Sequence, residues 1–208
     1  MNEPRLSPAL EPLEFCPTAL QSDDLISDFE VTQGSLAGAA IDGLIMRSGR
    51  LRNVDFRDTC LERLELMDVC LTDCDLANVE WRQASMHRVQ LDRCRLTGAR
   101  LPESTMQDVL LSNCIGKLSQ FRFARLPACH FEACDLQDAD FQGTDLTGAL
   151  FSDCDLRNVE MSQATLMGTD LTSSTIDGLR ANPEALKGMI IEPHQAVWVA
   201  SLFGVEIR

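Results

Sequence analysis

Large apolar side chains recur at every fifth residue between residues 26 and 176. Stepping by five through this stretch gives 31 positions, and 30 of them hold Leu, Ile, Val, Met, Phe or Trp; Gly116 is the exception. In an α-helix, residues five apart are rotated by about 140° from one another, so this pattern would not form an apolar stripe on a helix. The period therefore indicates short extended segments separated by turns and repeated along the chain.

A second column, of small residues, lies two positions before each large one. Gly, Ala, Ser, Thr, Cys or Val fills 27 of its 31 positions, and the exceptions are Asp24, Phe29, Leu44 and Leu64. Residues two apart on an extended chain point to the same side, so both columns face inward and the residue between them faces outward. The two residues after the large one are often Gly, Asn, Asp, Thr or Ser, which suit a corner. Because Leu44 and Leu64 are large for their column, we expect wider or locally distorted coils near them.

The cysteines indicate how many sides form each coil. Six of the nine lie in the small column, and four five-residue sides per coil explain why five of those six are 20 residues apart. Stacked coils then place these thiols one above another. The 151 residues from 26 to 176 form about 7.5 coils, and a spacing of roughly 4.8 Å gives a rod about 36 Å long. The chain shows no export signal, which argues against disulfides, and no close Cys or His pairs, which argues against a metal site. We therefore expect the thiols to be reduced and to pack in the interior. The five are Cys74, Cys94, Cys114, Cys134 and Cys154.

Repeats such as Cys-Asp-Leu-Gln-Asp at 134–138 and Thr-Asp-Leu-Thr-Gly at 144–148 resemble the pentapeptide-repeat family. The consensus of that family is a small residue, Asp or Asn, Leu or Phe, and two variable residues. The resemblance covers roughly three quarters of the chain and implies a right-handed, four-sided β-helix, in agreement with the cysteine spacing. The predicted fold class is an all-β solenoid, a right-handed quadrilateral β-helix of about 7.5 coils with a short α-helical C-terminal cap.

We expect three segments: an N-terminal arm or cap over residues 1–25, the β-helix over 26–178, and a helical cap and dimerisation segment over 179–208. Residues 1–25 contain four of the eight prolines. This segment either lies over the exposed strand edges of the first coil or is free in solution.

The missing apolar anchor at Gly116 predicts a bulge or side-wall kink, with Ile115 or Leu118 turned inward.

The pattern becomes helical after residue 176. Asn182, Pro183 and Gly188 predict a short helix, and a second helix is expected from Pro193 to Gly204, followed by an extended segment at 205–207. This second helix is apolar nearly all round. Since one face is enough to cap the rod, the surplus apolar surface argues for a partner, most simply an identical chain.

The C-terminal segment is also similar to the C-termini of pentapeptide-repeat proteins linked to quinolone resistance and microcin immunity. In those proteins the terminal helix forms a twofold dimer. The similarity therefore implies a homodimer with Trp198, Leu202 and Phe203 in the interface.

Composition argues against several classes of function. The net charge of −14 and a pI near 4.5 argue against direct binding to nucleic acid or an anionic membrane. Residues 1–10 lack the apolar core of a signal peptide and no stretch approaches 18 apolar residues, which predicts a cytoplasmic protein. His87, His130 and His194 lie far apart in the repeat, and phosphate-binding, nucleophile and metal motifs are missing. We therefore expect no enzyme activity, no cofactor and no metal site.

Charge is distributed unevenly along the chain. The net charge is −7 for residues 1–46, −3 for 47–80, +5 for 81–126, −9 for 127–178 and zero for 179–208. The −9 segment spans about 2.5 coils, or roughly 12 Å, which gives about one net negative charge per 1.3 Å, against one per roughly 1.7 Å of duplex DNA. Outward carboxylates of this segment form the candidate surface for a partner: Asp135, Asp140, Asp145, Asp155 and Glu160.

Two interpretations of this charge stay open. In the first, the rod mimics DNA and binds a type II topoisomerase such as DNA gyrase, and dimerisation joins two acidic segments at its centre. In the second, the acidic wall only keeps the rod soluble, and the protein is a scaffold or interaction protein of unassigned role without topoisomerase activity. The basic segment 81–126 does not fit a uniform DNA mimic and equally suits the docking of a different, acidic partner.

Overall fold

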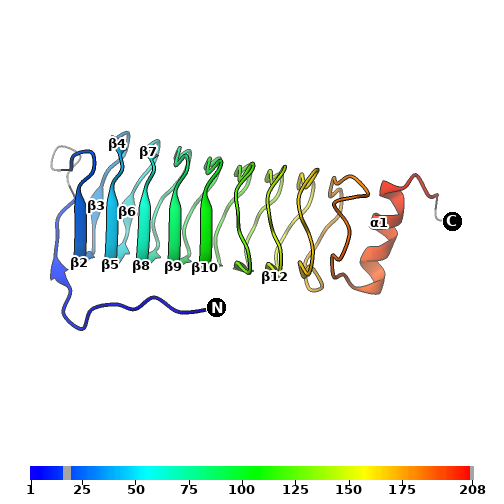
Figure 1. Ribbon diagram of the computed structural model, residues 1–208, viewed down its shortest axis with the longest axis horizontal. Coiled ribbons are helices and arrows are strands. Elements are labelled where there is room, and N and C mark those ends of the chain that lie inside the picture. The colour runs from blue at the N-terminus through cyan, green and yellow to red at the C-terminus, as the bar shows by residue number, and fades with distance from the viewer. Residues whose placement is uncertain (16–19, 207–208) are drawn as a thin grey trace.

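Parallel pairing between residues 20 apart builds the rod. In the computed structural model, which describes residues 1–15 and 20–206, Leu25 lies beside Ile45, and this offset continues to the last bridge, between Asp170 and Ile190. The chain forms a β-solenoid of about seven turns that ends in a short helix (Figure 1). The predicted fold class is confirmed. The pairing itself extends past residue 178, since Arg180 is bridged to the preceding coil.

One wall of the solenoid is an eight-stranded parallel sheet in the order β1-β2-β5-β8-β9-β10-β11-β12, and two further walls carry the pairs β3-β6 and β4-β7. Isolated bridges continue the pairing on the other sides. The elements are β1 (Glu11–Pro12), β2 (Leu25–Val31), β3 (Gly34–Ser35), β4 (Ala40–Asp42), β5 (Ile45–Arg52), β6 (Val54–Asp55), β7 (Cys60–Glu62), β8 (Glu65–Thr72), β9 (Ser85–Asp92), β10 (Thr105–Ser112), β11 (His130–Glu132), β12 (Leu150–Ser152), the 3₁₀-helix η1 (Pro193–Gln195) and α1 (Ala196–Leu202).

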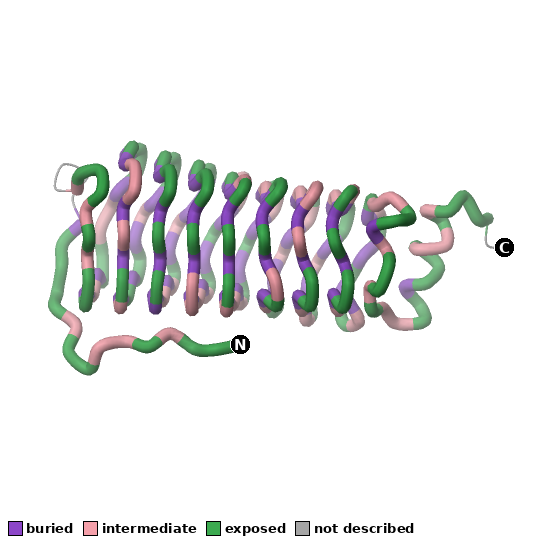
Figure 2. The backbone as a smooth tube through the Cα atoms, viewed as in Figure 1, coloured by how far each residue is buried: buried purple, intermediate pink, exposed green. Residues whose placement is uncertain are grey.

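The two inward columns fill the interior. Buried residues follow one another at the spacing that the sequence predicts (Figure 2). Leu44 and Leu64 are fully buried and the backbone pairing around them is regular, so the expected distortion there is wrong. Phe29, another large residue of the small column, is accommodated by Gly49 in the next coil. A Cβ atom at Gly49 would lie only 2.2 Å from Cζ of Phe29.

Most corners bend through a residue with left-handed backbone conformation. The second residue after the large one has a positive φ in most repeats, and 22 of these residues are not glycine; Asp23, just before the first repeat, brings the number of such residues to 23. Twelve of the 23 are Asp or Asn, which tolerate this conformation. For other L-residues it costs about 1–2 kcal/mol. The corner composition seen in the sequence therefore has a backbone cause.

The cysteine column forms one wall, as predicted. Its five thiols are buried, and each Sγ donates a weak hydrogen bond to a carbonyl oxygen 23 residues earlier, as from Cys154 to Phe131 at 3.4 Å. Burial raises the pKa of the Cys129 thiol, in the same small column, to about 12. The eight described cysteines are free, and Cys16 lies outside the described residues.

The coil at Gly116 has no bulge. Ile115 keeps its bridges to both neighbouring coils, and Leu118 occupies the corner with a φ of +59°. The two side chains are 48% and 57% exposed, so the predicted kink with one of them turned inward is wrong. Leu136 of the next coil occupies the space instead, since a Cβ at Gly116 would lie 2.8 Å from its Cδ2.

The N-terminal arm closes the first coil. β1 pairs with β2, and the backbone N–H of Leu13 donates to the oxygen of Glu30 at 2.9 Å. Phe15 is 7% exposed and its ring lies 6.3 Å from that of Phe29. The strand edge of β2 is thereby covered and the end of the apolar interior is closed.

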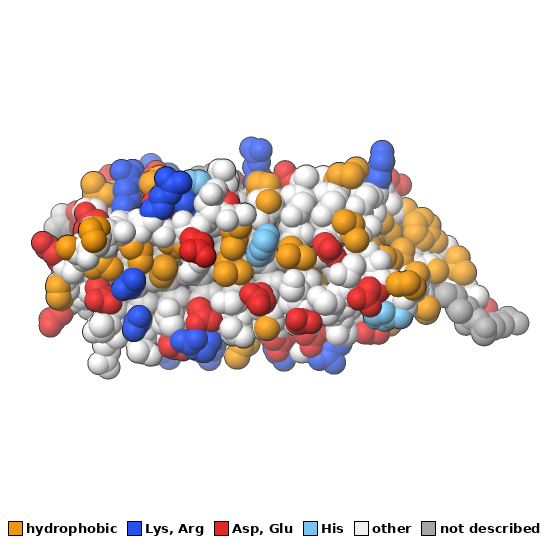
Figure 3. Space-filling model, turned by 90° about the horizontal axis from the view of Figure 1, so that it is seen from below, with side chains coloured by type: hydrophobic (Ala, Val, Ile, Leu, Met, Phe, Trp, Pro, Cys, Tyr) orange, Lys and Arg blue, Asp and Glu red, His pale blue; other side chains and the backbone are white. Residues whose placement is uncertain are grey.

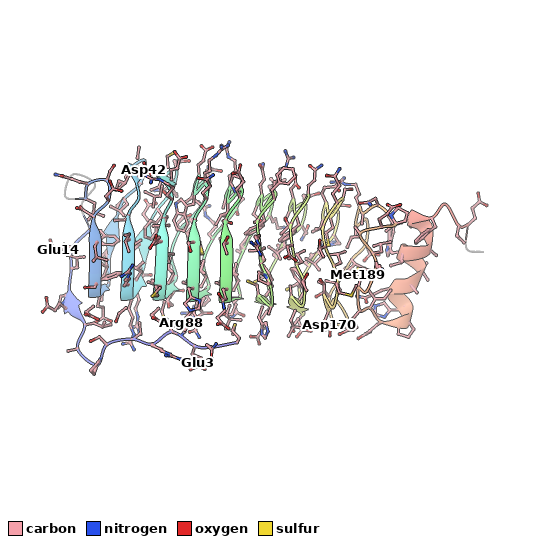
Figure 4. The ribbon with its side chains drawn as sticks, in the orientation of Figure 1. Glu3, Glu14, Asp42, Arg88, Asp170 and Met189 are labelled. Atoms are coloured by element: carbon pink, nitrogen blue, oxygen red, sulfur yellow. The ribbon has the colours of Figure 1, made fainter. Side chains whose placement is uncertain are left out.

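Residues 1–10, which precede β1, follow one long edge of the rod, and the arm reaches toward the middle of the rod at its N-terminus (Figure 4). Its polar contacts are to three rungs of one corner, those of Ser48, Asp68 and Asp108. The backbone N–H of Ser7 donates to Ser48 Oγ, that of Arg5 to Asp68 Oδ1, and Asn2 donates to both carboxylate oxygens of Asp108, at 2.8–2.9 Å. The described part of segment 1–25 thus lies against the solenoid.

Four phenylalanines pack in the C-terminal half of the interior. Phe121 stacks on Phe141 with ring centroids 4.9 Å apart, and Phe131 stacks on Phe151 at 4.6 Å. Phe141 also meets Phe131 and Phe151 edge to face, at 6.2 and 6.0 Å. Phe141 therefore contacts the three other rings of the cluster.

Substitution Phe141→Ala is expected to destabilise the fold by about 3–5 kcal/mol, because it leaves a cavity beside three aromatic rings. Chemical unfolding followed by circular dichroism measures the loss. The matched control is Phe123→Ala, at an exposed corner, which should shift the free energy of unfolding by less than about 0.5 kcal/mol. Equal effects of the two substitutions would contradict the core placement of Phe141.

Candidate functional site

The five carboxylates of the candidate partner surface lie on three of the four walls. Asp135 and Asp155 are neighbours on one wall, Asp140 and Glu160 on the next, and Asp145 stands on a third. Each occupies the outward position of its repeat, so successive carboxylates lie one side further around the coil. The structure brings them together as two stacked pairs and one single residue, in a band around the rod.

Four of these five carboxylates are bound to cations. Asp145 forms no ion pair with any residue in 1–15 or 20–206, and accepts hydrogen bonds from the backbone N–H and hydroxyl of Thr147, at 3.1 and 2.6 Å. Exposed ion pairs contribute only about 0–1 kcal/mol each to stability, so their main effect is on the surface potential. The pairs are Lys117 Nζ–Asp135 Oδ2 at 3.0 Å, Arg122 Nε–Asp140 Oδ2 at 2.6 Å, Arg157 Nη2–Asp155 Oδ2 at 2.5 Å and Arg180 Nε–Glu160 Oε2 at 3.1 Å.

Hydrogen bonds keep two of these groups ionised. The Arg157 guanidinium lowers the pKa of Asp155. Partial burial pushes the pKa of Glu160 upward, but hydrogen bonds from Ser162 and from Arg180 outweigh it, so the pKa is lowered. Both carboxyl groups therefore carry their charge at neutral pH.

The ion pairs reduce the charge density of the acidic segment. Lys117, Arg122 and Arg180 lie outside residues 127–178 but bind carboxylates inside it, so the local net charge changes from −9 to −6. Over roughly 12 Å this is about one net negative charge per 2 Å, still close to the value of roughly 1.7 Å for duplex DNA. On the face seen in Figure 3, carboxylates and cations are interspersed along the rod.

The basic segment 81–126 is compensated in the same way. Three of its arginines bind carboxylates 20 residues earlier, on the preceding coil. The pairs are Arg88–Asp68, Arg93–Asp73 and Arg95–Asp75, with shortest distances of 2.6–2.9 Å. Net charge counted along the sequence does not detect these pairs. A comparison of each residue with the one 20 positions away would have found them. Three cations of the basic segment 81–126 form no ion pair within the described part of the chain: Arg82, Arg100 and Arg125.

The open end of the rod is closed by a buried glutamine. In earlier coils, the carbonyl oxygen of a large inward residue accepts a hydrogen bond from a small-column side chain 23 residues later, as Phe151 does from Ser174 at 2.9 Å. For Leu171 the donor is Gln195 Nε2, which also donates to the oxygen of Ser174, both at 2.7 Å. Gln195 Oε1 accepts from the backbone N–H of Glu192 and the residue is 2% exposed. Sequence analysis missed this role, for which a polar residue beside an apolar helix is the only signal.

The predicted dimer residues have different environments on α1. Trp198 is 39% exposed and its indole N–H donates to Asp177, whereas Phe203, directly after the helix, is 57% exposed. Leu202 is partly buried against the core. Exposed Val197 and Val205 extend the apolar surface, and hydrophobic side chains gather at this end in Figure 3. A homodimer through this surface remains a prediction.

The structure corrects the rest of the C-terminal prediction. Residues 183–188 form turns instead of the expected short helix. The second helix begins at Pro193 as η1 and continues as α1, close to its predicted bounds. Val205 and Glu206 are not in a strand, and residue 207 of the expected extended segment lies outside the described residues.

A groove of about 570 Å³ lies between the last coil and α1, with serine and threonine residues along the coil and Val197 and Trp198 on the helix side.

Within residues 1–15 and 20–206, no three His, Cys, Asp or Glu side chains are grouped closely enough to hold a metal ion. No helix in the described part of the chain has the length and apolar character needed to cross a membrane.

Two models of known families match the repeat. A pentapeptide repeat region matches residues 64–141, and pentapeptide repeats in eight copies match residues 134–172. Among curated proteins, the uncharacterized protein YisX of Bacillus subtilis (strain 168) is 27% identical over 126 residues, which are 61% of this chain and 59% of YisX. The match thus spans less than two thirds of that relative.

Solved structures resemble the chain at low sequence identity. A trypsin-treated variant of QnrB1, a plasmid-mediated fluoroquinolone resistance protein, is 17% identical, with 96% of this chain and 98% of that chain covered and a TM-score of 0.45. The pentapeptide repeat protein AT2G44920 from the thylakoid lumen of Arabidopsis thaliana is 20% identical, with 52% and 72% covered and a TM-score of 0.37.

Substitution Gln195→Ala is expected to detach η1 and α1, because two buried carbonyl oxygens lose their donor, at about 1–3 kcal/mol each. Hydrogen exchange at residues 193–202 measures the effect. Gln195→Glu is the sharper variant, since it keeps the shape but replaces the donor with an oxygen facing two carbonyls. If Gln195→Glu exchanges as slowly as the wild type, Gln195 does not hold the cap.

Proposed function

This chain belongs to the pentapeptide-repeat family, and we propose that it is a non-enzymatic protein-binding module that presents DNA-like negative charge to a type II topoisomerase such as DNA gyrase. The observation that carries the proposal is the acidic band of residues 127–178. Its net charge per unit length stays close to that of duplex DNA after cations from outside the segment are counted. A basic groove built for DNA would attract such a rod by the same long-range electrostatics.

A homodimer would strengthen this proposal. The apolar surface of α1 and Phe203 lies beyond the C-terminal end of the acidic band (Figure 1). A twofold contact there would place two acidic bands on either side of the central junction. The rod available to a groove would then be twice as long, with its negative charge near the middle.

A second candidate function is a scaffold or interaction protein without topoisomerase activity. The specific observation in its favour is that Asp135, Asp140, Asp155 and Glu160 are already bound to cations of the same chain. Their distribution over three walls also differs from a single DNA-like face. Under this interpretation the carboxylates mainly keep a long β surface soluble.

A supercoiling assay with purified gyrase, with and without a fluoroquinolone, separates the two candidates. We expect the wild-type protein to change gyrase activity at micromolar concentration. The triple variant Asp135→Lys, Asp145→Lys and Asp155→Lys should weaken the effect at least tenfold, because it reverses charges on two walls of the acidic band.

The matched control reverses three exposed carboxylates in the N-terminal half, at Glu14, Glu62 and Glu65. Both triple variants change the net charge from −14 to −8, so only the position of the change differs. An equal loss in the two variants would indicate nonspecific electrostatics. No effect of the wild-type protein leaves the scaffold function.

The dimer is tested by size-exclusion chromatography with light scattering. We expect a mass near 46 kDa for the wild type, twice the 23.0 kDa of the chain, and near 23 kDa for Trp198→Ala combined with Phe203→Asp. Leu25→Asp is the control, since Leu25 is 59% exposed at the opposite end of the rod. A wild-type monomer at high concentration would contradict the dimer.

A further inference from the structure

One coil of this acidic protein is basic and apolar on its outside. Residues 109–131 contain no Asp or Glu, although the chain has 32 of them, and they contain Lys117, Arg122 and Arg125. The same coil exposes Ile115, Leu118 and Phe123, whose exposed fractions are 48%, 57% and 58%. These six residues are called the 115–125 patch.

The apolar members of the patch stand at unfavourable positions. Leu118 and Phe123 are corner residues with φ of +59° and +56°, where bulky side chains are strained. Glycine occupies the same corners in adjacent coils, at Gly98 before Leu118 and at Gly143 after Phe123. Asp or Asn would also relieve the strain, so the stability of the fold does not account for Leu and Phe at these corners. Strain of this kind is typical of functional surfaces.

The inside of this coil shows the opposite change. Gly116 is the one glycine in a column of 31 large apolar positions, while Ile115 beside it faces outward. The coil has therefore lost an apolar group from its core column and carries three on its surface. Leu118 and Phe123 stand at the two corners of the wall that holds Gln120, and Ile115 and Arg125 lie on the walls before and after it. Exposed apolar side chains on adjoining walls of one coil are typical of interaction sites.

The charges around the patch indicate the chemistry of its partner. Arg125 and, one coil earlier, Arg100 form no ion pair within the described residues, whereas Lys117 and Arg122 bind Asp135 and Asp140 of the next coil. Arg100 lies beside Glu80 and Arg125 beside Asp145 on neighbouring rungs, but neither guanidinium is within ion-pair distance of these carboxylates. An apolar centre with such guanidinium groups nearby complements a segment that carries both apolar and acidic side chains. An anionic membrane would meet the acidic residues that begin at Glu132, well within one Debye length of the patch.

We propose that the 115–125 patch docks an acidic, apolar segment of a partner protein. Leu118 and Phe123 supply the apolar anchors at the two corners of one side, and Arg100 and Arg125 attract the carboxylates of the partner. This surface differs in chemistry from the acidic band, and its role does not depend on binding to a topoisomerase.

The test is a selection from a random twelve-residue peptide display library on the full-length protein. A parallel selection uses the variant Leu118→Asn with Phe123→Asn, in which asparagine suits the corner backbone and leaves the fold intact. We expect peptides that combine Asp or Glu with Leu, Ile or Phe. They should bind the variant at least tenfold more weakly and Arg100→Gln with Arg125→Gln several-fold more weakly, while binding to Leu25→Ser is unchanged.

The thermal melt of the asparagine variant provides the second measurement, and we expect a melting temperature equal to or higher than that of the wild type. Peptides that bind wild type and asparagine variant equally, peptides rich in Lys or Arg, or no enrichment at all would overturn the proposal. Flotation with vesicles of phosphatidylcholine and phosphatidylserine is the remaining comparison. Vesicle binding that the asparagine variant abolishes would assign the patch to a membrane surface and overturn a protein partner.

Discussion

Parallel backbone pairing between residues 20 apart is the constraint on which the rest of the structure depends. It makes the residue 20 positions away a spatial neighbour of every residue, at roughly the 4.8 Å spacing of adjacent strands. The thiol column, the stacked phenylalanines and the ion pairs of Arg88, Arg93 and Arg95 all follow from this one offset. Each coil contacts only its neighbours, so the structure is close to one-dimensional, and its two ends need separate solutions.

The two ends are closed by different means. At the first coil, β1 extends the sheet and Phe15 covers the apolar interior, so the exposed strand edge is covered by the chain itself. At the last coil, Gln195 provides the hydrogen bonds that a further coil would have provided, and α1 covers the interior. Because β1 covers one edge and α1 exposes a broad apolar surface at the other end, the walls and α1 are candidate surfaces for partners.

The sequence was sufficient to predict the solenoid because large apolar side chains recur every five residues and each side of the coil is also five residues long. It was insufficient wherever backbone pairing overrides a local signal. Gly116 lacks the anchor, yet the ladder on both sides holds the coil in register and Leu136 occupies the space. Asn182, Pro183 and Gly188 resemble helix boundaries, but the ladder continues on both sides of them, at Arg180 and Ile190, and the segment between forms turns.

The candidate surfaces were harder to predict because charge was counted along the chain and not between coils. The carboxylates of the acidic band face outward as predicted, but the cations of three of them, Lys117, Arg122 and Arg180, come from beyond the segment, whereas Arg157 lies within it, two residues from Asp155. In a ladder, identical charges one coil apart repel, as Asp135 and Asp155 do on adjacent rungs. Lys117 and Arg157 offset that repulsion. Positions where the chain provides no such compensation are therefore informative. Asp145 forms no ion pair within the described residues although Arg125 lies on the adjacent rung, and Phe123 has a strained backbone under an exposed ring that the solenoid itself does not require.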